Sequence, residues 1–206
     1  KTKIIQDDSL LKKATNNGLK NIYLDLDNKV NDDCSHRNKL KQNLFLTSKT
    51  VFLMAFTGYS FLALHGNIFR KDLLSFLNNG GKIKIILTDP KGDIAKRIAY
   101  AEANIQYNTE KININYSYIK SYEDCIEQFI ELKKTYGEQI QLKLSNDILT
   151  ATILMSENEC FFEPYLYFFQ DKHKVKTFEI VVDNKSKLYL HMHELFQTYW
   201  EHSKTI

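Results

Sequence analysis

Apolar and polar positions in the central part of the chain follow two different periods, one after the other. An apolar run over Val51 to Phe56 is followed, after a Thr57-Gly58 turn, by apolar residues at helical spacing over 67–79. Gly80-Gly81 ends that pattern, and a second apolar run, KIKIILT, covers 82–88. Strand, helix, glycine stop and strand in this order are typical of a parallel βαβ unit. We therefore expect an open α/β sheet with a ligand site beyond its strand ends.

The rest of the chain has further periodic segments, interrupted by polar ones. The polar stretch NKVNDDCSHRN over 28–38 indicates a solvated connection, and 104–120 is ambiguous between helix and loop. We divide the chain into residues 1–49, a helix-and-strand extension or the end of an upstream region, and a main domain over 50–206. The pattern predicts helices over 8–17, 93–104, 121–136 and 186–203, and strands around 22–26, 140–144, 148–155, 160–169 and 178–182.

Charge and cysteine content narrow the classes of protein. The 28 basic and 25 acidic residues are spread along the chain, without the clustered excess that marks a duplex-binding surface. Cys34, Cys125 and Cys160 have no CxxC or Cys/His spacing, which argues against zinc or a disulfide framework and favours a reducing cytoplasm. No apolar run approaches the roughly 18–20 residues that span a bilayer. We expect no cofactor, no membrane partner, and nucleic-acid contact only through an upstream domain; position 1 is Lys, as in a piece of a longer protein.

Small and charged residues follow both predicted parallel strands. Backbone amides in such a turn, together with a helix N-terminus, form an anion site without any catalytic residue, and an Arg holds phosphate through two parallel hydrogen bonds. In the second half, Thr152, Glu163 and Tyr165 flank the corresponding strand ends. The candidate ligand-binding residues are Thr57, Gly58, Ser60, His65, Arg70, Thr88, Asp89, Lys91, Arg97 and Glu163.

Each candidate also has an ordinary structural interpretation. Hydroxyls in a Thr-Gly-Tyr-Ser turn commonly cap the next helix, and Asp89 before Pro90 is suited to the same role. Arg70 and Arg97 are placed to pair with acids on solvated helix faces. The aromatic run FFEPYLYFF is either a buried strand or a base-stacking surface, and Glu163 within it lies at an edge or faces a ligand.

Four segments together resemble the phospholipase D-like α/β fold, in particular its catalytically degenerate regulatory and sensor domains. They are VFLMAFTGYS, FRKDLLSFLNNGGKIKIILTDP, IQLKLSNDILTATILMSENECFFEPYLYFF and ELFQTYWEHS, within 50–203. The resemblance implies a mixed sheet flanked by helices. Active members carry HxKxxxxD, whose His attacks phosphorus while the Lys holds phosphoryl oxygens. The complete motif is absent here, since His36, His173 and His191 are followed by the wrong spacing.

The resemblance and the residues lead to one main functional expectation and two alternatives. We expect a cytoplasmic, non-catalytic sensor or regulatory domain that binds a phosphorylated small molecule or nucleotide and signals to an attached domain or partner. The resemblance also implies a homodimer, formed through the Trp200 helix or the aromatic strand. The alternatives are a metal-dependent phosphodiesterase or nuclease using His65, Asp89 and Glu163, and a purely structural dimerisation module.

Overall fold

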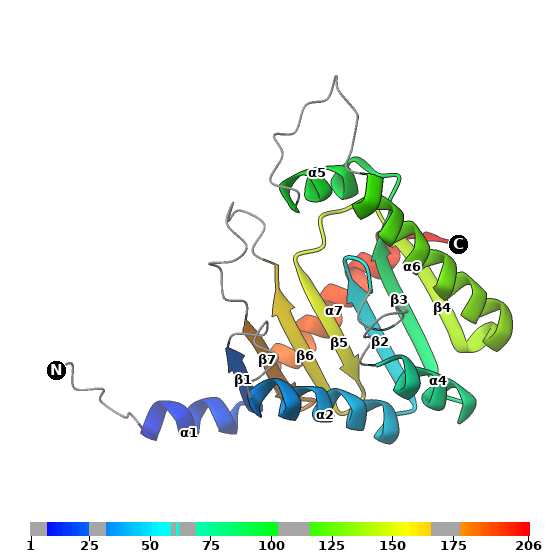
Figure 1. Ribbon diagram of the computed structural model, residues 1–206. Helices are drawn as coiled ribbons and strands as arrows, with labels where there is room; N and C mark the ends of the chain where they lie inside the picture. The colour runs from blue at the N-terminus through cyan, green and yellow to red at the C-terminus, as the bar shows by residue number, and fades with distance from the viewer. Residues whose placement is uncertain (1–7, 25–31, 59–60, 62–68, 103–115, 166–177) are drawn as a thin grey trace.

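The central feature of the fold is one mixed sheet of eight strands, in the order β1-β7-β6-β5-β2-β3-β4-β8. The computed structural model describes residues 8–24, 32–58, 61, 69–102, 116–165 and 178–206. Helices lie on both faces of the sheet and beyond one of its ends (Figure 1). The predicted α/β fold with a mixed, helix-flanked sheet is therefore confirmed.

The parallel part of the sheet consists of β2 (Thr50–Ala55), β3 (Lys82–Thr88) and β4 (Ile140–Ser145). β2 pairs with β3, and β3 with β4, in parallel register. Helix α4 (Arg70–Asn78) connects β2 to β3, which confirms the predicted βαβ unit. Gly80 has a φ of 82°, and its N–H donates to the Leu77 carbonyl at 3.0 Å, so the glycine pair ends the helix as expected.

The remaining strands are antiparallel to their neighbours. β5 (Ala151–Ser156) pairs with β2, β6 (Glu159–Pro164) with β5, and β7 (Phe178–Asp183) with β6. The N-terminal strand β1 (Leu19–Leu24) pairs with β7 and is one edge of the same sheet. The short β8 (Lys204–Thr205) pairs with β4 at the other edge.

Alternation along the strands creates two apolar cores, one on each face of the sheet. Helices α2 (Asp32–Thr47), α4 and α6 (Tyr116–Tyr136) cover one face, where buried residues such as Leu44, Leu73 and Phe129 pack together. Helix α7 (Lys187–His202) covers the other face with Tyr189 and Phe196 (Figure 1). Helix α5 (Asp93–Glu102) lies beyond the carboxyl ends of the parallel strands. These ends are where the sheet leaves room for a site.

The prediction of a solvated connection over 28–38 is wrong from residue 32 onward, because residues 32–38 form the first part of helix α2. Leu44 and Phe45 bury the second half of the helix, but Lys41, one turn earlier, is also buried, at 7% exposure. A helix that buries a cation on its inner face lacks the continuous apolar stripe by which helices are recognised. The polar sequence therefore concealed a helix.

Most other predicted elements are found, with shifted ends. α6 begins at Tyr116, five residues before the predicted start, and β5 begins at Ala151, so that Ile148 stays outside the strand and is 52% exposed. The final helix is confirmed, with Ser186 as its N-cap. Helix α1 (Asp8–Asn16) agrees with the first predicted helix. Residues 166–169 of the predicted aromatic strand and most of the ambiguous 104–120 lie outside the described residues.

Candidate functional site

A small cavity lies at the carboxyl end of β2, beside β5 and β6 and beneath α2. We call it the strand-end pocket; its volume is about 160 Å³. Its lining combines two cations, one carboxylate, three side-chain hydroxyls, an amide and aromatic rings. The lining residues are Arg37, Asn38, Lys41, Ala55, Thr57, Gly58, Phe61, Phe69, Thr152, Glu163 and Tyr165.

Three predicted ligand-binding residues, Thr57, Gly58 and Glu163, meet in this pocket although more than 100 positions separate the first two from the third. Gly58 has a φ of 67°, in the left-handed region that favours glycine. A Cβ at this position would lie 3.0 Å from the ring of Phe129 and 3.2 Å from Leu87. The turn after β2 therefore needs glycine both for its backbone angle and for its close packing.

Tyr165 ties the β2 and β5 sides of the pocket together. Its hydroxyl oxygen accepts a hydrogen bond from the Phe56 amide at 2.9 Å and another from the Thr152 hydroxyl at 2.7 Å. Its ring packs against the small cluster of Phe56, Ile98 and Tyr122, which joins α5 and α6 to the strand ends. The hydroxyl side of the pocket is thus held by two hydrogen bonds and by packing, which fixes its geometry.

Helix α2 supplies the cationic side of the pocket. Arg37, Asn38 and Lys41 lie on one face of the helix because residues separated by three or four positions share a face. Lys41 forms an ion pair with Glu179 of β7, whose carboxylate is only 1% exposed, and Arg37 Nε lies 3.8 Å from the same carboxylate. The Lys41 ammonium also lies 5.5 Å from the ring centroid of Phe161. The cations are therefore held in place from behind by one buried acid.

The charges of the described residues around the pocket are balanced. Arg37 and Lys41 contribute two positive charges, while Glu163 in the lining and Glu179 behind it contribute two negative ones. The positive charge lies on the α2 side and the Glu163 carboxylate on the β6 side. Such a polarised cavity offers donors for an anionic group on one side and an acceptor for hydroxyl groups on the other.

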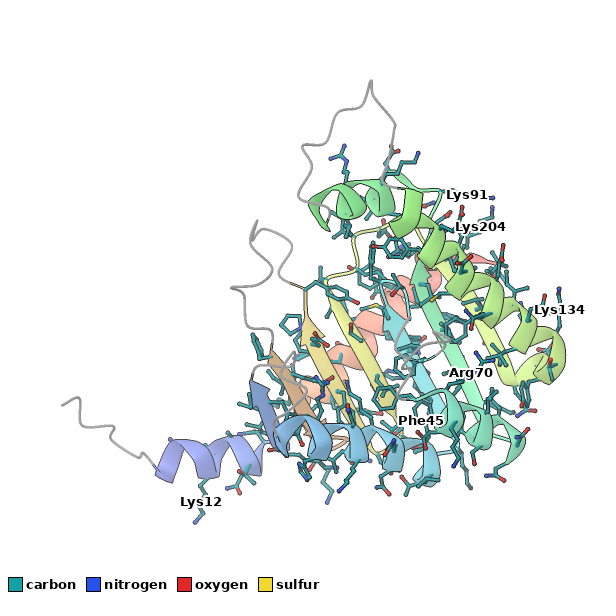
Figure 2. All side chains as sticks on the ribbon, in the orientation of Figure 1. Lys12, Phe45, Arg70, Lys91, Lys134 and Lys204 are labelled. Carbon is teal, nitrogen blue, oxygen red and sulfur yellow. The ribbon has the colours of Figure 1, made fainter. Side chains whose placement is uncertain are left out.

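The other predicted site residues lie elsewhere. Arg70 donates to Gln128 of α6 at 3.0 Å, and Figure 2 shows it at α4. Thr88 is buried at the end of β3 next to Phe56, whose carbonyl accepts from its amide at 3.2 Å. Asp89 accepts from the Lys91 amide at 2.9 Å, so it shapes the turn before α5. Lys91 and Arg97 are exposed, while Ser60 and His65 lie outside the described residues.

The geometry separates the acids that the enzyme alternative would place around one metal. Glu163 is on β6 and Asp89 follows β3, and β5 and β2 lie between these strands. At about 4.8 Å per strand, the two strands are about 14 Å apart, too far for one cation to bind both carboxylates. Across the described parts of the chain, no three His, Cys, Asp or Glu side chains are grouped so that they could hold a metal ion.

The sequence does contain one His-x-Lys triplet, His202-Ser203-Lys204, in addition to the histidines discussed above. It lies where α7 ends and β8 begins, and β8 pairs with β4 at the far edge of the sheet from β6. The Ser203 hydroxyl donates to the Tyr199 carbonyl at 2.6 Å. The triplet is therefore part of the helix end and is remote from the strand-end pocket.

Sequence reasoning missed the α2 contribution to the pocket. A signal for it exists in the spacing of Arg37, Lys41, Leu44 and Phe45, which are positions i, i+4, i+7 and i+8 of one helix face. Two of the four residues are basic. The buried face of this helix can therefore be recognised in the sequence only if Arg and Lys are accepted as core positions. Thr152 and Tyr165, noted as flanking the strand ends, do line the pocket.

No helix within the described residues is both long and apolar enough to cross a membrane.

No family model and no curated protein matches the sequence. Solved structures do match. A phosphatidylserine synthase of Haemophilus influenzae Rd KW20 is 16% identical over 90% of this chain and 39% of its own, with a TM-score of 0.58. Nuc of Salmonella typhimurium, a phospholipase D family member, is 14% identical over 82% of this chain and 89% of its own, with a TM-score of 0.43.

The chain has a phospholipase D-like fold. TrmBL2, an archaeal chromatin protein described with a novel mode of DNA binding, is also similar, at 13% identity and a TM-score of 0.53. It covers 97% of this chain, which spans 61% of TrmBL2 and 39% of the synthase. At such low identities the phospholipase D-like likeness concerns the fold alone. The site has to be argued from this chain's own residues.

Proposed function

We propose that this phospholipase D-like domain is a non-catalytic cytoplasmic sensor that binds a small phosphorylated ligand, a sugar phosphate or a nucleotide, in the strand-end pocket. The observation that carries the proposal is the meeting of Arg37 and Lys41 with Glu163 and three hydroxyls in one cavity. A guanidinium and an ammonium suit a phosphoryl group, and a carboxylate accepts hydrogen bonds from sugar hydroxyls.

The size of the pocket limits which part of the ligand enters it. A volume of about 160 Å³ corresponds to roughly five water molecules at about 30 Å³ each. It accommodates a phosphoryl group together with the adjoining hydroxyl-bearing edge of a sugar, so the base of a nucleotide extends outside the cavity. We therefore place the phosphoryl group against α2 and a sugar hydroxyl against Glu163.

The composition of the pocket favours binding without turnover. The complete HxKxxxxD motif is absent from the sequence. Among the described lining residues, Glu163 is the only acid, and there is no His or Cys. The described lining therefore pairs the hydroxyls of Thr57, Thr152 and Tyr165 with no general base of the His type, which a hydroxyl nucleophile needs. Occupancy rather than chemistry is the output that this set of residues can produce.

The signal would pass to a further domain or subunit. TrmBL2, which is longer than this chain, is described as a chromatin protein that binds DNA. The proposal also includes a homodimer formed through α7, where Leu190 is 54% exposed. Light scattering with and without ligand tests that part separately.

The test is calorimetric titration with inorganic phosphate, ribose 5-phosphate, AMP, cyclic AMP and unphosphorylated ribose, with and without magnesium. We expect at least one phosphorylated compound to bind and to be recovered unchanged. Arg37→Gln should weaken that binding by about tenfold or more, through loss of a charged hydrogen-bond donor. Arg70→Gln is the matched control, because Arg70 donates to Gln128 and is not among the lining residues.

Two results would reject the proposal. A ligand that is consumed, with or without magnesium, would make the protein an enzyme. If no compound of the panel binds, the remaining hypothesis is that the domain is a purely structural dimerisation module. Glu163→Gln adds a further check: it should weaken binding of the sugar phosphates more than binding of inorganic phosphate, which has no sugar hydroxyl.

A further inference from the structure

A second hollow lies at the opposite end of the parallel strands, where β2 and β3 begin. We call it the amino-end groove; it lies between the C-terminal halves of α2 and α4 and has a volume of about 480 Å³. Small-molecule sites commonly measure about 300–1,000 Å³. The lining residues are Phe45, Leu46, Ser48, Lys49, Thr50, Ser75, Phe76, Asn79, Gly80, Gly81 and Lys82.

The groove is positively charged. Lys49 and Lys82 line it, and no acidic residue occurs among the lining residues that the structure describes. Neither lysine forms an ion pair within the described parts of the chain. The neighbouring Glu157 carboxylate accepts from the backbone amides of Lys49 and Thr50, at 2.7 and 3.3 Å, and is not part of the lining. An anion entering the groove therefore meets two ammonium groups without an acid among the lining residues.

The C-terminal end of α4, which borders the groove, does not cancel this charge. A helix C-terminus is electronegative because its last carbonyls lack partners. Here the Leu77 carbonyl accepts from the amide of Gly80 at 3.0 Å and from the Gln139 side chain at 2.7 Å, and the Phe76 carbonyl accepts from Gly81 at 3.0 Å. The Phe76 and Leu77 carbonyls near the end of α4 are thus already bound to donors within the protein.

The groove also has a free hydroxyl and an apolar wall. Ser48 Oγ is buried and has no hydrogen-bond partner among the described residues. Leu46 is 70% exposed at the rim, and the rings of Phe45 and Phe76 form the floor. Figure 2 shows Phe45 where α2 and α4 lie next to each other. Charge, a donor and an apolar surface occur together, as in sites for amphiphilic small molecules.

We propose that the amino-end groove binds a small organic anion with an aromatic or aliphatic body. The anionic group lies between Lys49 and Lys82 with Ser48 as a further donor, and the apolar body lies against Leu46. This site is separate from the strand-end pocket, because the two hollows lie at opposite ends of β2. One ligand can therefore bind without the other.

The probe for this test is anilinonaphthalene sulfonate, an aromatic anion whose fluorescence rises when it enters an apolar site. We expect saturable binding of one molecule per chain, weakened by added salt because two exposed cations contribute. The Lys49→Gln, Lys82→Gln double variant should lose about tenfold in affinity. Ser75→Trp, on the exposed side of α4, should weaken binding as well by filling the groove while both lysines remain.

The matched control removes the same charge elsewhere. The Lys12→Gln, Lys134→Gln double variant lowers the net charge equally, and Figure 2 shows both residues away from the groove, on α1 and α6. Its affinity should equal that of the unchanged protein. The proposal is overturned if the probe does not saturate, or if the Lys49, Lys82 and Ser75 variants bind it as well as the control does.

Discussion

Lys41 is a buried cation whose charge is balanced chiefly by one carboxylate. Lys41 is 7% and Glu179 1% exposed, and they form an ion pair between α2 and β7. Lys41→Met would leave the Glu179 charge in the interior; among the described residues, Arg37 would then be the one cation paired with it, with Nε at 3.8 Å. Removing one partner of a buried pair costs about 3–5 kcal/mol. We expect a loss of about 3 kcal/mol in unfolding free energy, measured by urea denaturation.

An exposed pair offers the contrast for that measurement. Lys134 and Glu131 on α6 lie 2.7 Å apart, and both side chains are more than half exposed. Exposed pairs contribute about 0–1 kcal/mol, so Lys134→Met should leave the unfolding free energy nearly unchanged. Equal effects of Lys41→Met and Lys134→Met would show that burial does not decide the strength of the α2–β7 pair.

Single residues also explain how far the candidate site was predictable. Thr57, Gly58 and Glu163 were identified because they follow strands, and strand ends converge at one edge of a sheet. Arg70 was selected by the same proximity in sequence, yet its guanidinium turns toward Gln128 on α6. The direction of a long side chain depends on the neighbouring helix, which the local sequence does not specify.

At the scale of elements, the start of α7 depends on a single cap. The Ser186 hydroxyl accepts a hydrogen bond from the Leu188 amide at 3.1 Å, and Ser186 itself is buried. Ser186→Ala removes that acceptor and should lower the unfolding free energy by about 1 kcal/mol. Ser75→Ala, within α4 and exposed, is the matched control and should be neutral or slightly stabilising, because Ala is the better helix former. Urea midpoints of the two variants decide the comparison; a Ser186→Ala midpoint no lower than that of Ser75→Ala would contradict the capping role.

Elements with one apolar period were predictable, and α2 was not. α4 and α7 present apolar residues to one face of the sheet and were located within a few residues of their ends. α2 instead buries Lys41 against Glu179, so its inner face mixes charge with apolar side chains. A charged residue can be assigned to the core only when the buried residue that pairs with it is also known. That pairing joins segments more than 130 residues apart.

For the whole molecule, the order of strands places the two hollows at opposite ends of the same parallel unit. The βαβ pattern predicted parallel neighbours, and the resemblance to the phospholipase D-like fold predicted the mixed sheet. The position of β1 at the edge beside β7 had no local signal, because its pairing partner lies at the other end of the chain. The fold was thus more predictable than the site, because the site includes residues of α2 and forms only when α2 packs on that side of the sheet.

Alkaline pH should destabilise the whole domain, because buried thiol and tyrosine hydroxyl groups keep their protons in the folded state. Burial, followed by the charge of Asp124, raises the pKa of Cys125 to about 11 from an ordinary value of 9.0. Burial, with Glu179 as the second cause, raises the pKa of Cys160, and burial raises that of Tyr189. The folded state holds these protons more tightly than the unfolded chain does. The contribution of Cys125 is therefore complete below about pH 9 and is lost as the pH rises through about 11. Cys160 and Tyr189 contribute in the same direction, because their pKa values are also raised.

Urea midpoints measured from pH 7.5 to 10.5 test this expectation. We expect a constant midpoint up to about pH 9 and a fall above it, since the unfolded chain then releases thiol protons that the folded protein retains. Cys160→Ala should be less stable at neutral pH, because it leaves a cavity in a fully buried position, but its midpoint should fall less steeply above pH 9. Apart from Cys160 itself and Tyr189, whose pKa Cys160 helps to raise, the two proteins carry the same ionisable groups, so the difference in slope reports on this buried pair. A Cys160→Ala slope as steep as that of the unchanged protein would mean that the alkaline loss arises from other groups.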